Sequence, residues 1–487
     1  MIQGAVQRND VTAKMLRTID NAKTMASAGV APAVHIVSPA TRVAAGKALR
    51  DSVPREQHGR WNGVKGRSDL IEVLRKSDAG RLKELIPIKY GRMLQSPFAF
   101  YRGAAGIMAA DLAQAMPTTG LRVQACGDCH LLNFGGFATP ERNIIFDIND
   151  FDETLPGPWE WDIKRLAASI LLAARANGLS DAQGRDCAVN CARKYREHMR
   201  EFSRMDPLGT WYVETTASDF IESLPKAMRK RVRKRIDKTS GRSRSEFDFP
   251  KLAGAVGGQI RIKDQPPLIF HPGTTRAPEA DVKLEHLFSA YRESLSEDHR
   301  VLLDRYRLVD VAIKVVGVGS VGRRCWIALM MSEGNGPLFL QFKEAVSSVL
   351  EPYAGKSTYG HHGQRVVTGQ RLMQPASDIF LGWTTAPNGR HFYVRQLHDA
   401  KIKPMVETFD AEMLDVYAQA CGWVLARAHA KASEVSATIS GYLGSSNDAF
   451  DVAMGKFAVA YADRAERDHT ALKAAVRRGE IIASEGA

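Results

Sequence analysis

Three polar residues in the segment 125–153 have the types and the spacing that phosphoryl transfer requires. Asp128 and Asn133 lie in the stretch GDCHLLN, and Asp150 follows in the acidic stretch NDFDE. Phosphoryl transfer needs a carboxylate that orients the attacking hydroxyl, and a carboxylate and an amide oxygen that hold Mg²⁺ against the phosphates. Asp128 suits the first role. Asn133 and Asp150 suit the second, with Asp152 as a further candidate metal ligand.

The order of these residues resembles the catalytic and metal-binding loops of kinase-like phosphotransferases, especially the aminoglycoside and choline kinases. Asp128 then corresponds to the catalytic aspartate, Asn133 to the metal-binding asparagine and Asp150 to the acidic residue that opens the metal-binding turn. The resemblance also implies that Asp162, in the first turn of a helix expected at 159–179, braces the catalytic loop by hydrogen bonding. The alternative is a turn-rich loop whose carboxylates cap helices and bind water. The ordered set of three favours function.

The same stretch also matches C-x-x-C-H, the pattern of c-type haem attachment, through Cys126, Cys129 and His130. Haem attachment requires export, and the N-terminal residues show no basic head followed by a continuous apolar segment. A zinc site would need a second C-x-x-C pair, whereas Cys187 and Cys191 have the spacing of helical core residues. The six cysteines form no disulfide framework. We therefore expect reduced thiols in a cytoplasmic protein, without haem or zinc.

A second segment, 309–351, has the pattern of three strands with a glycine-rich turn after the first. Its glycines form G-x-G-x-x-G and enclose a serine: Gly317, Gly319, Ser320 and Gly322. Dinucleotide-binding folds share this motif but need a helix after the glycines. Here the residues 323–331 are β-branched, aromatic and sulfur-rich, and they run into an Asn-Gly turn. A glycine loop between strands covers the phosphates of ATP in kinases, and Lys343 is then the expected phosphate-binding lysine.

The elements after this lysine continue the kinase-like pattern with one departure. A helix expected at 359–374 is followed by two strands, and in kinase terms the hinge of the nucleotide site falls at Gln396 and Leu397. The helix contains no glutamate, so the usual partner of the phosphate-binding lysine is missing there. Glu344 or Glu351 would have to replace it.

The two sets of motifs occur in the reverse of the kinase order, in which the glycine loop precedes the catalytic loop. Either the chain is a circular permutation of a kinase-like fold, or the motifs belong to unrelated domains. A helix at 412–431, which resembles the one that leads into a kinase catalytic loop, favours permutation. We therefore expect an α+β, two-lobed, circularly permuted kinase-like fold. It would place Lys343 within about 10 Å of Asp150, and the end of the 412–431 helix beside the strand 121–125.

Four regions follow from this interpretation: an N-terminal extension at 1–60, a helical lobe with the catalytic loop at 61–304, a β-rich nucleotide-binding lobe at 305–398, and C-terminal helices at 399–487. From about Gly46 to about Asp468, the sequence also resembles the bacterial domain-of-unknown-function 2252 family. The stretches SPFAFYRG, GDCHLLNFG and FDINDFDE carry this resemblance. It implies no activity by itself.

Charge limits the choice of partners. The 487 residues carry a net charge of +13, which favours anionic partners such as nucleotides, phosphorylated metabolites, nucleic acid or anionic lipid. No apolar run has the length of a membrane span. Ten basic residues lie between 224 and 245 without an aromatic residue among them, which favours a solvated helix face over nucleic-acid contact. Arg92 and Arg102 are candidate partners for a phosphate or carboxylate, with surface ion pairing as the alternative.

Together these features predict an enzyme that binds ATP and Mg²⁺ and transfers a phosphoryl group to an unknown, small-molecule acceptor. Two alternatives stay open. The same site could transfer AMP with the nucleotide reversed, or the protein could bind nucleotide or nucleic acid without catalysis. The sequence does not define the oligomeric state.

Overall fold

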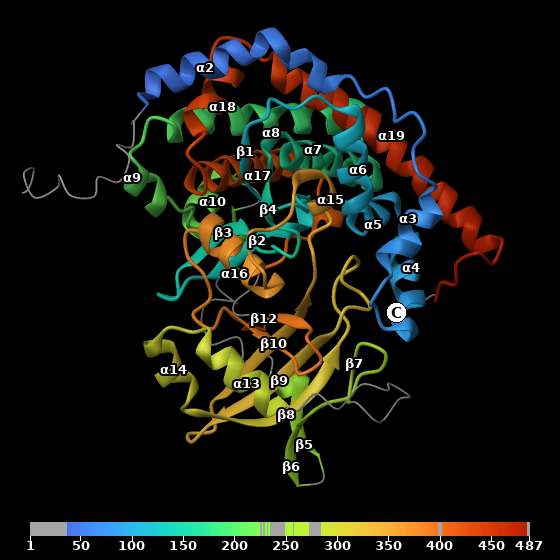
Figure 1. Cartoon of the computed structure of the whole chain (residues 1–487), viewed down its shortest axis with the longest axis vertical. Coiled ribbons are helices and arrows are strands. Elements are labelled where there is room, and N and C mark those ends of the chain that lie inside the picture. The colour runs from blue at the N-terminus through green and yellow to red at the C-terminus, as the bar shows by residue number, and fades with distance from the viewer. Residues whose placement is uncertain are drawn as a thin grey trace, which may run out of the picture. The chain divides into compact units, whose positions relative to one another are not determined.

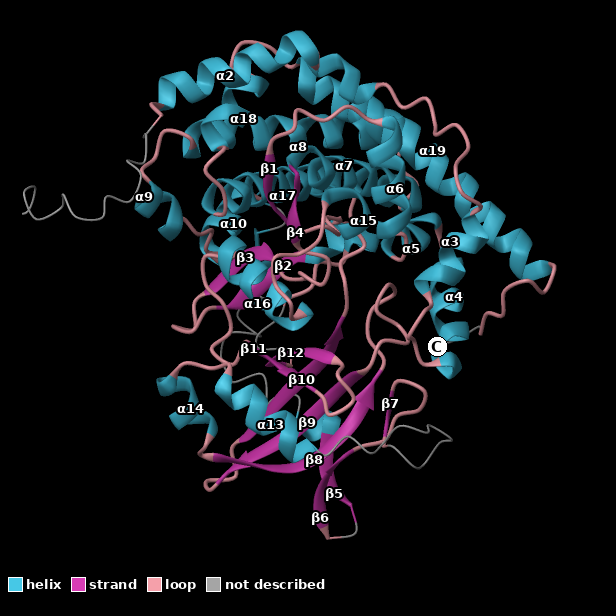
Figure 2. Cartoon of the chain, viewed as in Figure 1, coloured by secondary structure: helices cyan, strands magenta, loops and turns pink. Residues whose placement is uncertain are grey.

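The computed structural model describes residues 37–224, 249–256, 258–271, 284–397 and 402–484, together with residues 226, 229, 230, 232 and 233. By its contacts the chain forms two compact units, 1–41 and 42–487, and the functional residues all belong to the second. That unit is an α+β structure in which one region is mostly helical and another is built on a six-stranded sheet (Figures 1 and 2).

The helical region is organised around one buried helix, α7 (Trp159–Ala176), in which every residue from Trp159 to Ala174 is buried. A helix that is buried on all sides must be covered by others. The helices that surround it are α6 (Ala105–Ala115), α8 (Asp181–Phe202), α17 (Ala411–Lys431), α18 (Ser436–Leu443) and α19 (Ala449–Arg477). Helix α8 begins with a capping box formed by Ser180 and Gln183, so it is a helix separate from α7. The expected helices at 159–179 and 412–431 are confirmed.

Residues 42–60 pack on the C-terminal helices. Helix α2 (Pro39–Ser52) approaches α18 so closely that a Cβ atom on Gly46 would lie 1.9 Å from the carbonyl oxygen of Thr438. In the short 3₁₀ helix η1 (Arg55–Gly59), His58 Nε2 lies 2.8 Å from the hydroxyl of Tyr442. This part of the expected extension at 1–60 therefore belongs to the helical region. Further short helices line one side of it: α3 (Leu70–Ser77), η2 (Lys83–Leu85), α4 (Ile86–Leu94) and α5 (Pro97–Arg102).

The six-stranded sheet is antiparallel, with the strand order β11-β12-β10-β9-β8-β7. Its strands are β7 (Ile269–Phe270), β8 (Tyr306–Lys314), β9 (Cys325–Ser332), β10 (Pro337–Ala345), β11 (Gly382–Thr385) and β12 (His391–Gln396). The expected three strands in 309–351 are confirmed as β8, β9 and β10. Asn335 turns the chain between β9 and β10 with a φ of 60°, a conformation that asparagine tolerates well. Successive residues of β10 do not alternate between buried and exposed, because this strand is covered on both faces.

The glycine- and proline-rich stretch 254–278, which falls within the expected helical lobe at 61–304, contains strands. Besides β7 it includes most of the hairpin of β5 (Ala253–Val256) and β6 (Gln259–Ile262). Two helices, α13 (Leu284–Glu293) and α14 (Glu297–Leu303), follow before β8. Tyr291 of α13 donates a hydrogen bond of 2.6 Å to the carbonyl oxygen of Phe380, beside β11. The elements associated with the sheet thus begin earlier than the expected boundary at 305.

Four short strands of the segment 122–158 form two separate antiparallel pairs. Strand β1 (Arg122–Ala125) pairs with β4 (Leu155–Pro158), and β2 (Phe134–Ala138) pairs with β3 (Ile144–Ile148). The remaining elements are η3 (Leu131–Asn133), α9 (Pro207–Tyr212), α10 (Ala217–Ser223), α15 (Glu351–Ala354), α16 (His362–Met373) and η4 (Val406–Thr408). Asp147, which precedes the acidic stretch NDFDE, lies in β3, where it is buried and 2.5 Å from Arg427 Nη2. The pair satisfies both charges inside the core.

Two further expectations concern the basic run and the absence of a membrane span. The basic run at 224–245 lies almost wholly outside the described residues. Among the helices that are described, none combines the length and the apolar character that crossing a membrane requires.

Candidate functional site

A cleft of about 680 Å³ is lined both by strands of the sheet and by loops of the helical region. An adjoining chamber of about 250 Å³ shares several lining residues with it. Of the residues singled out in the sequence, the cleft is lined by Asn133, Asp150, Gly317, Ser320, Lys343, Gln396 and Leu397. Asp128, Asp152 and Gly319 line the chamber, and Gly322 lines neither. Motifs separated by almost two hundred residues therefore line the same cleft.

Lys343 joins the two motif sets by direct contact. Its ammonium group forms an ion pair with Asp152, 191 residues away in the sequence, and lies 4.0 Å from Asp150 Oδ1. The expected proximity of Lys343 and Asp150 is confirmed. Burial by itself would lower the pKa of Lys343, but the carboxylates of Asp150 and Asp152 outweigh it and raise that pKa well above its ordinary value. The side chain therefore keeps its positive charge in the cleft.

Asp152 is the centre of a small hydrogen-bonded cluster. Its Oδ1 accepts a bond of 2.7 Å from the Tyr393 hydroxyl, and its Oδ2 accepts one of 3.1 Å from Ser320 Oγ. Burial and the Asp152 carboxylate both raise the pKa of Tyr393, so this hydroxyl keeps its proton. Since Tyr393 and Lys343 are directly paired across β10 and β12, the sheet presents both donors to one carboxylate.

The glutamates considered as partners of Lys343 have other roles, so that expectation is wrong. Glu344 faces away from the lysine, as neighbours on a strand do, and binds Arg390 at 2.8 Å. Glu351 Oε1 accepts a hydrogen bond from the Ser348 amide. Helix α16, which lacks a glutamate, instead uses Arg365 to donate bonds to the carbonyl oxygens of Asp152 and Thr154. Helix α16 thus holds the acidic loop in place, and Asp152 of that loop supplies the carboxylate that pairs with Lys343.

Asp128 is oriented by a buried arginine of α7. Arg165 Nε donates a hydrogen bond of 2.7 Å to Asp128 Oδ1, and Arg165 Nη2 lies 2.5 Å from the same oxygen. The Asn133 side-chain amide donates a bond of 2.8 Å to the backbone oxygen of Asp128. This bond uses the nitrogen of Asn133 and so leaves its Oδ1 as the atom suited to bind a cation. Asp128 and Asn133 are held in one rigid turn.

Asp162 braces this turn, as the resemblance implied. It accepts hydrogen bonds of 2.7 Å from the Cys126 amide and 3.0 Å from the Gly127 amide, and His429 Nε2 lies 3.2 Å from its Oδ2. His429 is in the last turn of α17, and Cys126 follows β1 directly. The expected proximity of the end of α17 to β1 is therefore confirmed. A buried carboxylate here satisfies backbone groups that would otherwise be unpaired.

The glycine loop, the segment between β8 and β9, is bound by the helical region. Arg92 Nη1 donates to the Gly317 carbonyl oxygen at 2.5 Å, and the Leu82 amide donates to that of Gly322 at 2.8 Å. Gly317 and Gly322 have φ values of 67° and 84°, which glycine adopts without strain. A Cβ atom on Gly319 would lie 3.3 Å from the Arg102 carbonyl oxygen. These contacts hold the glycine loop against the helical region.

The residues expected to form the hinge line the cleft, but their backbone amides are engaged. The Gln396 amide donates to Asp378 Oδ2 at 2.5 Å, and the Leu397 amide donates to the Phe339 carbonyl oxygen at 2.9 Å. A purine bound here would therefore have to use groups other than these two amides. The sequence could not show this, because the bond to Asp378 depends on how the chain returns after α16.

The oxygen donors of the cleft fit a hard divalent cation. The Asp150 carboxylate and Asn133 Oδ1 are the types of ligand that Mg²⁺ prefers, and both residues line the cleft and the chamber. Both oxygens of Asp152 already accept hydrogen bonds, and Oδ2 also pairs with Lys343. The geometry favours Asp150 and Asn133 as metal ligands and gives Asp152 the role of positioning Lys343.

Several site residues were not found from the sequence, namely Arg165, Arg365, Tyr393 and Arg395. Arg395 donates to Gln341 Oε1 at 3.1 Å and to the Asn149 carbonyl oxygen at 3.3 Å, so it ties the sheet to the acidic loop. No motif marks these residues, because each acts through a partner that is distant in the sequence. Arg102 was a candidate, and it does line both cavities.

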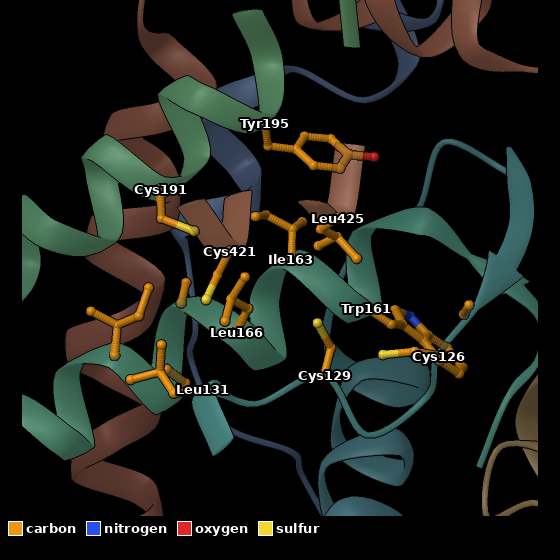
Figure 3. Close-up of a cluster of buried hydrophobic side chains, with 14 of the residues drawn as sticks. Cys126, Cys129, Leu131, Trp161, Ile163, Leu166, Cys191, Tyr195, Cys421 and Leu425 are labelled. Carbon is orange, nitrogen blue, oxygen red and sulfur yellow. The ribbon is translucent and has the colours of Figure 1, made fainter. Parts of the chain in front are cut away.

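The three residues of the C-x-x-C-H pattern, Cys126, Cys129 and His130, are buried in the core. Cys126 and Cys129 are buried beside Trp161, Ile163 and Leu166 (Figure 3). Their sulfur atoms and a carboxylate oxygen of Asp162 lie within 4.8 Å of one another, but that carboxylate already holds the backbone of the turn. Burial raises the pKa of Cys129 to about 12 and that of Cys126 well above its ordinary value.

These thiols are expected to stay reduced and free of haem and zinc. Metal binding needs thiolates, which burial disfavours at this position. The absorption spectrum and the zinc content of the purified protein provide the measurement. A haem band, or one zinc ion per chain, would contradict the prediction.

The fold and the cavity define an α+β protein with a charged cleft that combines a glycine loop, a buried lysine and an acidic loop. Residues 81–475 match the family described as an uncharacterized protein conserved in bacteria, DUF2252. Because the match covers most of the 487 residues, the chain belongs to this family. No curated protein and no solved structure matches the chain.

Proposed function

We propose that the protein is an ATP- and Mg²⁺-dependent phosphotransferase with a circularly permuted kinase-like fold, and that its acceptor is a small molecule. The observation that carries the proposal is the contact of Lys343 with Asp150 and Asp152 in a cleft that Asn133 and the glycine loop also line. Kinases bring the same four parts together at the phosphates of ATP: a glycine loop, a strand lysine, an asparagine and an acidic residue that bind metal.

The permutation is supported by where α17 ends. Its last turn contacts Asp162, which in turn holds the residues immediately after β1. In an unpermuted kinase-like chain, a helix of this kind leads directly into the catalytic loop. In this chain β8, β10 and α16 follow Asn133 in sequence but line the same cleft, and the end of α17 contacts Asp162.

In the proposed reaction, Asp128 accepts a hydrogen bond from the acceptor hydroxyl and orients it toward the γ-phosphorus. The acceptor oxygen bonds to that phosphorus while the bond to the β–γ bridging oxygen breaks, and ADP leaves with the electron pair. The hydroxyl proton passes to the Asp128 carboxylate and then to water. Lys343 stabilises the negative charge of the phosphates. Mg²⁺ held by Asp150 and Asn133 would supply further charge neutralisation.

Nucleotide binding is expected to depend on Mg²⁺. Calorimetry of the full chain should show ATP binding that Mg²⁺ strengthens, because the cation offsets repulsion between the phosphates and the carboxylates of the cleft. The Asp150→Ala variant should lose that enhancement, whereas Asp181→Ala, which removes an exposed carboxylate of α8, should keep it. Equal binding by the native protein with and without Mg²⁺ would overturn the metal assignment.

Transfer of AMP is a second candidate, and one observation favours it. Lys343 pairs with the acidic loop and not with a glutamate of α16, so the lysine is not placed as in kinases that transfer the γ-phosphoryl group. ATP labelled at the α- or the γ-phosphorus separates the two reactions. Labelled acceptor from γ-labelled ATP identifies phosphoryl transfer, whereas labelled acceptor from α-labelled ATP, with release of pyrophosphate, identifies AMP transfer. Binding without either product would leave a non-catalytic nucleotide-binding protein.

A further inference from the structure

The chamber beside the nucleotide cleft has a wall made by the start of α6. Ala104, Ala105, Gly106 and Ile107 line it, and α6 begins without a side chain that caps its first amides. The first N–H groups of a helix have no partner within the helix, and the helix dipole makes this end attractive to anions. Asp128 lines the same chamber. An anion bound at α6 would therefore lie in the space that the catalytic carboxylate faces.

A guanidinium group adds positive charge at the same place. Arg102 lies three residues before α6 and lines both the chamber and the cleft. Its Nε is buried and has no hydrogen-bond partner among the described residues. Burial lowers the pKa of Arg102, while the carboxylates of Asp128 and Asp150 oppose this effect. A buried donor of a charged group without a partner costs free energy unless a ligand satisfies it.

The carboxylates around Arg102 already have partners of their own. Asp128 is held by Arg165, and Asp152 pairs with Lys343. Glu344, farther along the wall, pairs with Arg324 and Arg390. Asp150 also favours the charged form of Arg102, and its Oδ1 lies 4.0 Å from Lys343 Nζ. These carboxylates are therefore shared between Arg102 and other cations.

His130 also lines the chamber and has a polar atom without a partner among the described residues. The residue is 4% exposed, its Nδ1 has no hydrogen-bond partner among the described residues, and its Nε2 lies 3.8 Å from Asp128 Oδ2. A ring nitrogen can donate or accept one hydrogen bond, and a buried polar atom without a partner is rare in proteins.

We propose that this chamber is the acceptor subsite, and that the acceptor is a small anionic molecule whose phosphate or carboxylate group binds Arg102 and the first amides of α6 while its hydroxyl contacts Asp128. The inference rests on the proposed function, for which it names the substrate class. The volume of about 250 Å³, small beside the 680 Å³ of the cleft, limits the acceptor to a few carbon atoms beyond the anionic group. The chain's net charge of +13 draws such molecules toward it.

Glycerol 3-phosphate and glycerol form a matched pair of probes, since they differ in the anionic group and share hydroxyls. Each is titrated by calorimetry into the full chain saturated with ADP and Mg²⁺, and again without nucleotide. Glycerol 3-phosphate should bind and glycerol should not. Arg102→Ala should weaken the binding of glycerol 3-phosphate by about 10- to 100-fold, the loss expected for a hydrogen bond to a charged group. Arg102→Lys should recover part of it.

Two controls separate this result from loss of structure or of general charge. Arg200→Ala removes an exposed cation of α8 that lines neither the chamber nor the cleft, and it should change the affinity by less than about threefold. The thermal unfolding midpoint of each variant should stay near that of the native chain. Inorganic phosphate, titrated in parallel, shows whether the anionic group alone suffices.

The main competing explanation is that Arg102 binds the γ-phosphate of ATP. In that case Arg102→Ala weakens a non-hydrolysable ATP analogue relative to ADP and leaves glycerol 3-phosphate unaffected, which overturns the proposal. Equal binding of glycerol and glycerol 3-phosphate, or no binding of either, also overturns it. If glycerol 3-phosphate binds through Arg102 but ATP does not bind, the anion subsite stands and the proposed phosphotransferase function fails.

Discussion

Replacing Asp128 by asparagine is expected to lower the rate of phosphoryl transfer by about 10²- to 10⁴-fold, the range for loss of a positioned general base. The affinity for ATP should change by less than about threefold. The reason is that Asp128 lines the chamber beside the cleft and not the cleft itself. Asparagine keeps the shape of the side chain and the contact with Arg165, but it removes the negative charge that orients and accepts the proton. Turnover of labelled ATP with a responsive acceptor gives the measurement.

The control for Asp128→Asn is Asp181→Asn. Asp181 is an exposed residue whose carboxylate binds Arg175 at 2.8 Å, so the control removes the same charge from a similar pair away from the cavity. Its turnover should equal that of the native protein. Native turnover in the Asp128 variant would contradict the catalytic role. A parallel loss of turnover and ATP affinity would instead mean that Asp128 belongs to the nucleotide site.

Replacing Asp152 by alanine is expected to lower the free energy of unfolding by about 3 kcal/mol. Removing one partner of a buried ion pair costs roughly 3–5 kcal/mol, and the lower end applies because the Asp152 side chain is 25% exposed. The change leaves Lys343, whose side chain is 4% exposed, with Asp150 at 4.0 Å, and it also deprives Tyr393 of its acceptor. Unfolding in urea, followed by circular dichroism, measures the loss.

A double variant, Asp152→Ala with Lys343→Met, should recover most of that stability, because it leaves neither charge of the pair without its partner. The cycle of single and double variants isolates the coupling between residues 191 positions apart. Additive effects would contradict the contact between β10 and the acidic loop, on which the two-motif site depends. A loss well below 1 kcal/mol in Asp152→Ala would have the same meaning.

The local elements of this chain follow from its sequence. Strands β8, β9 and β10 lie where the apolar runs, the glycine turn and the Asn-Gly turn predict them, and α7, α16 and α17 match the expected helices to within a few residues. Periodicity and turn chemistry depend on near neighbours, so they can be read without knowledge of the fold. The hydrogen bonds of Asp162 to the catalytic turn were also foreseen, through the resemblance to kinases.

The partners of the charged side chains depended on the tertiary structure. Lys343 binds Asp152 and not Glu344 or Glu351, and Asp147 pairs with Arg427 in the core. A cation in a sequence has many potential partners, and the choice is made by burial and by the path of distant strands. Strands β5, β6 and β7 were likewise not predicted from the glycine- and proline-rich composition of their segment. Such short strands are stabilised by the strands with which they pair.

The amino-acid sequence by itself determined which chemical groups this protein contains. They are the carboxylates of Asp128 and Asp150, the amide of Asn133, the glycine loop and Lys343 of β10. Only the tertiary structure decided that these groups line the cleft and its adjoining chamber, and that α6 and Arg102 line that chamber together with Asp128. The physical reason is that side-chain types and short-range backbone preferences are local properties. Electrostatic pairing and burial arise only when distant segments are brought into contact.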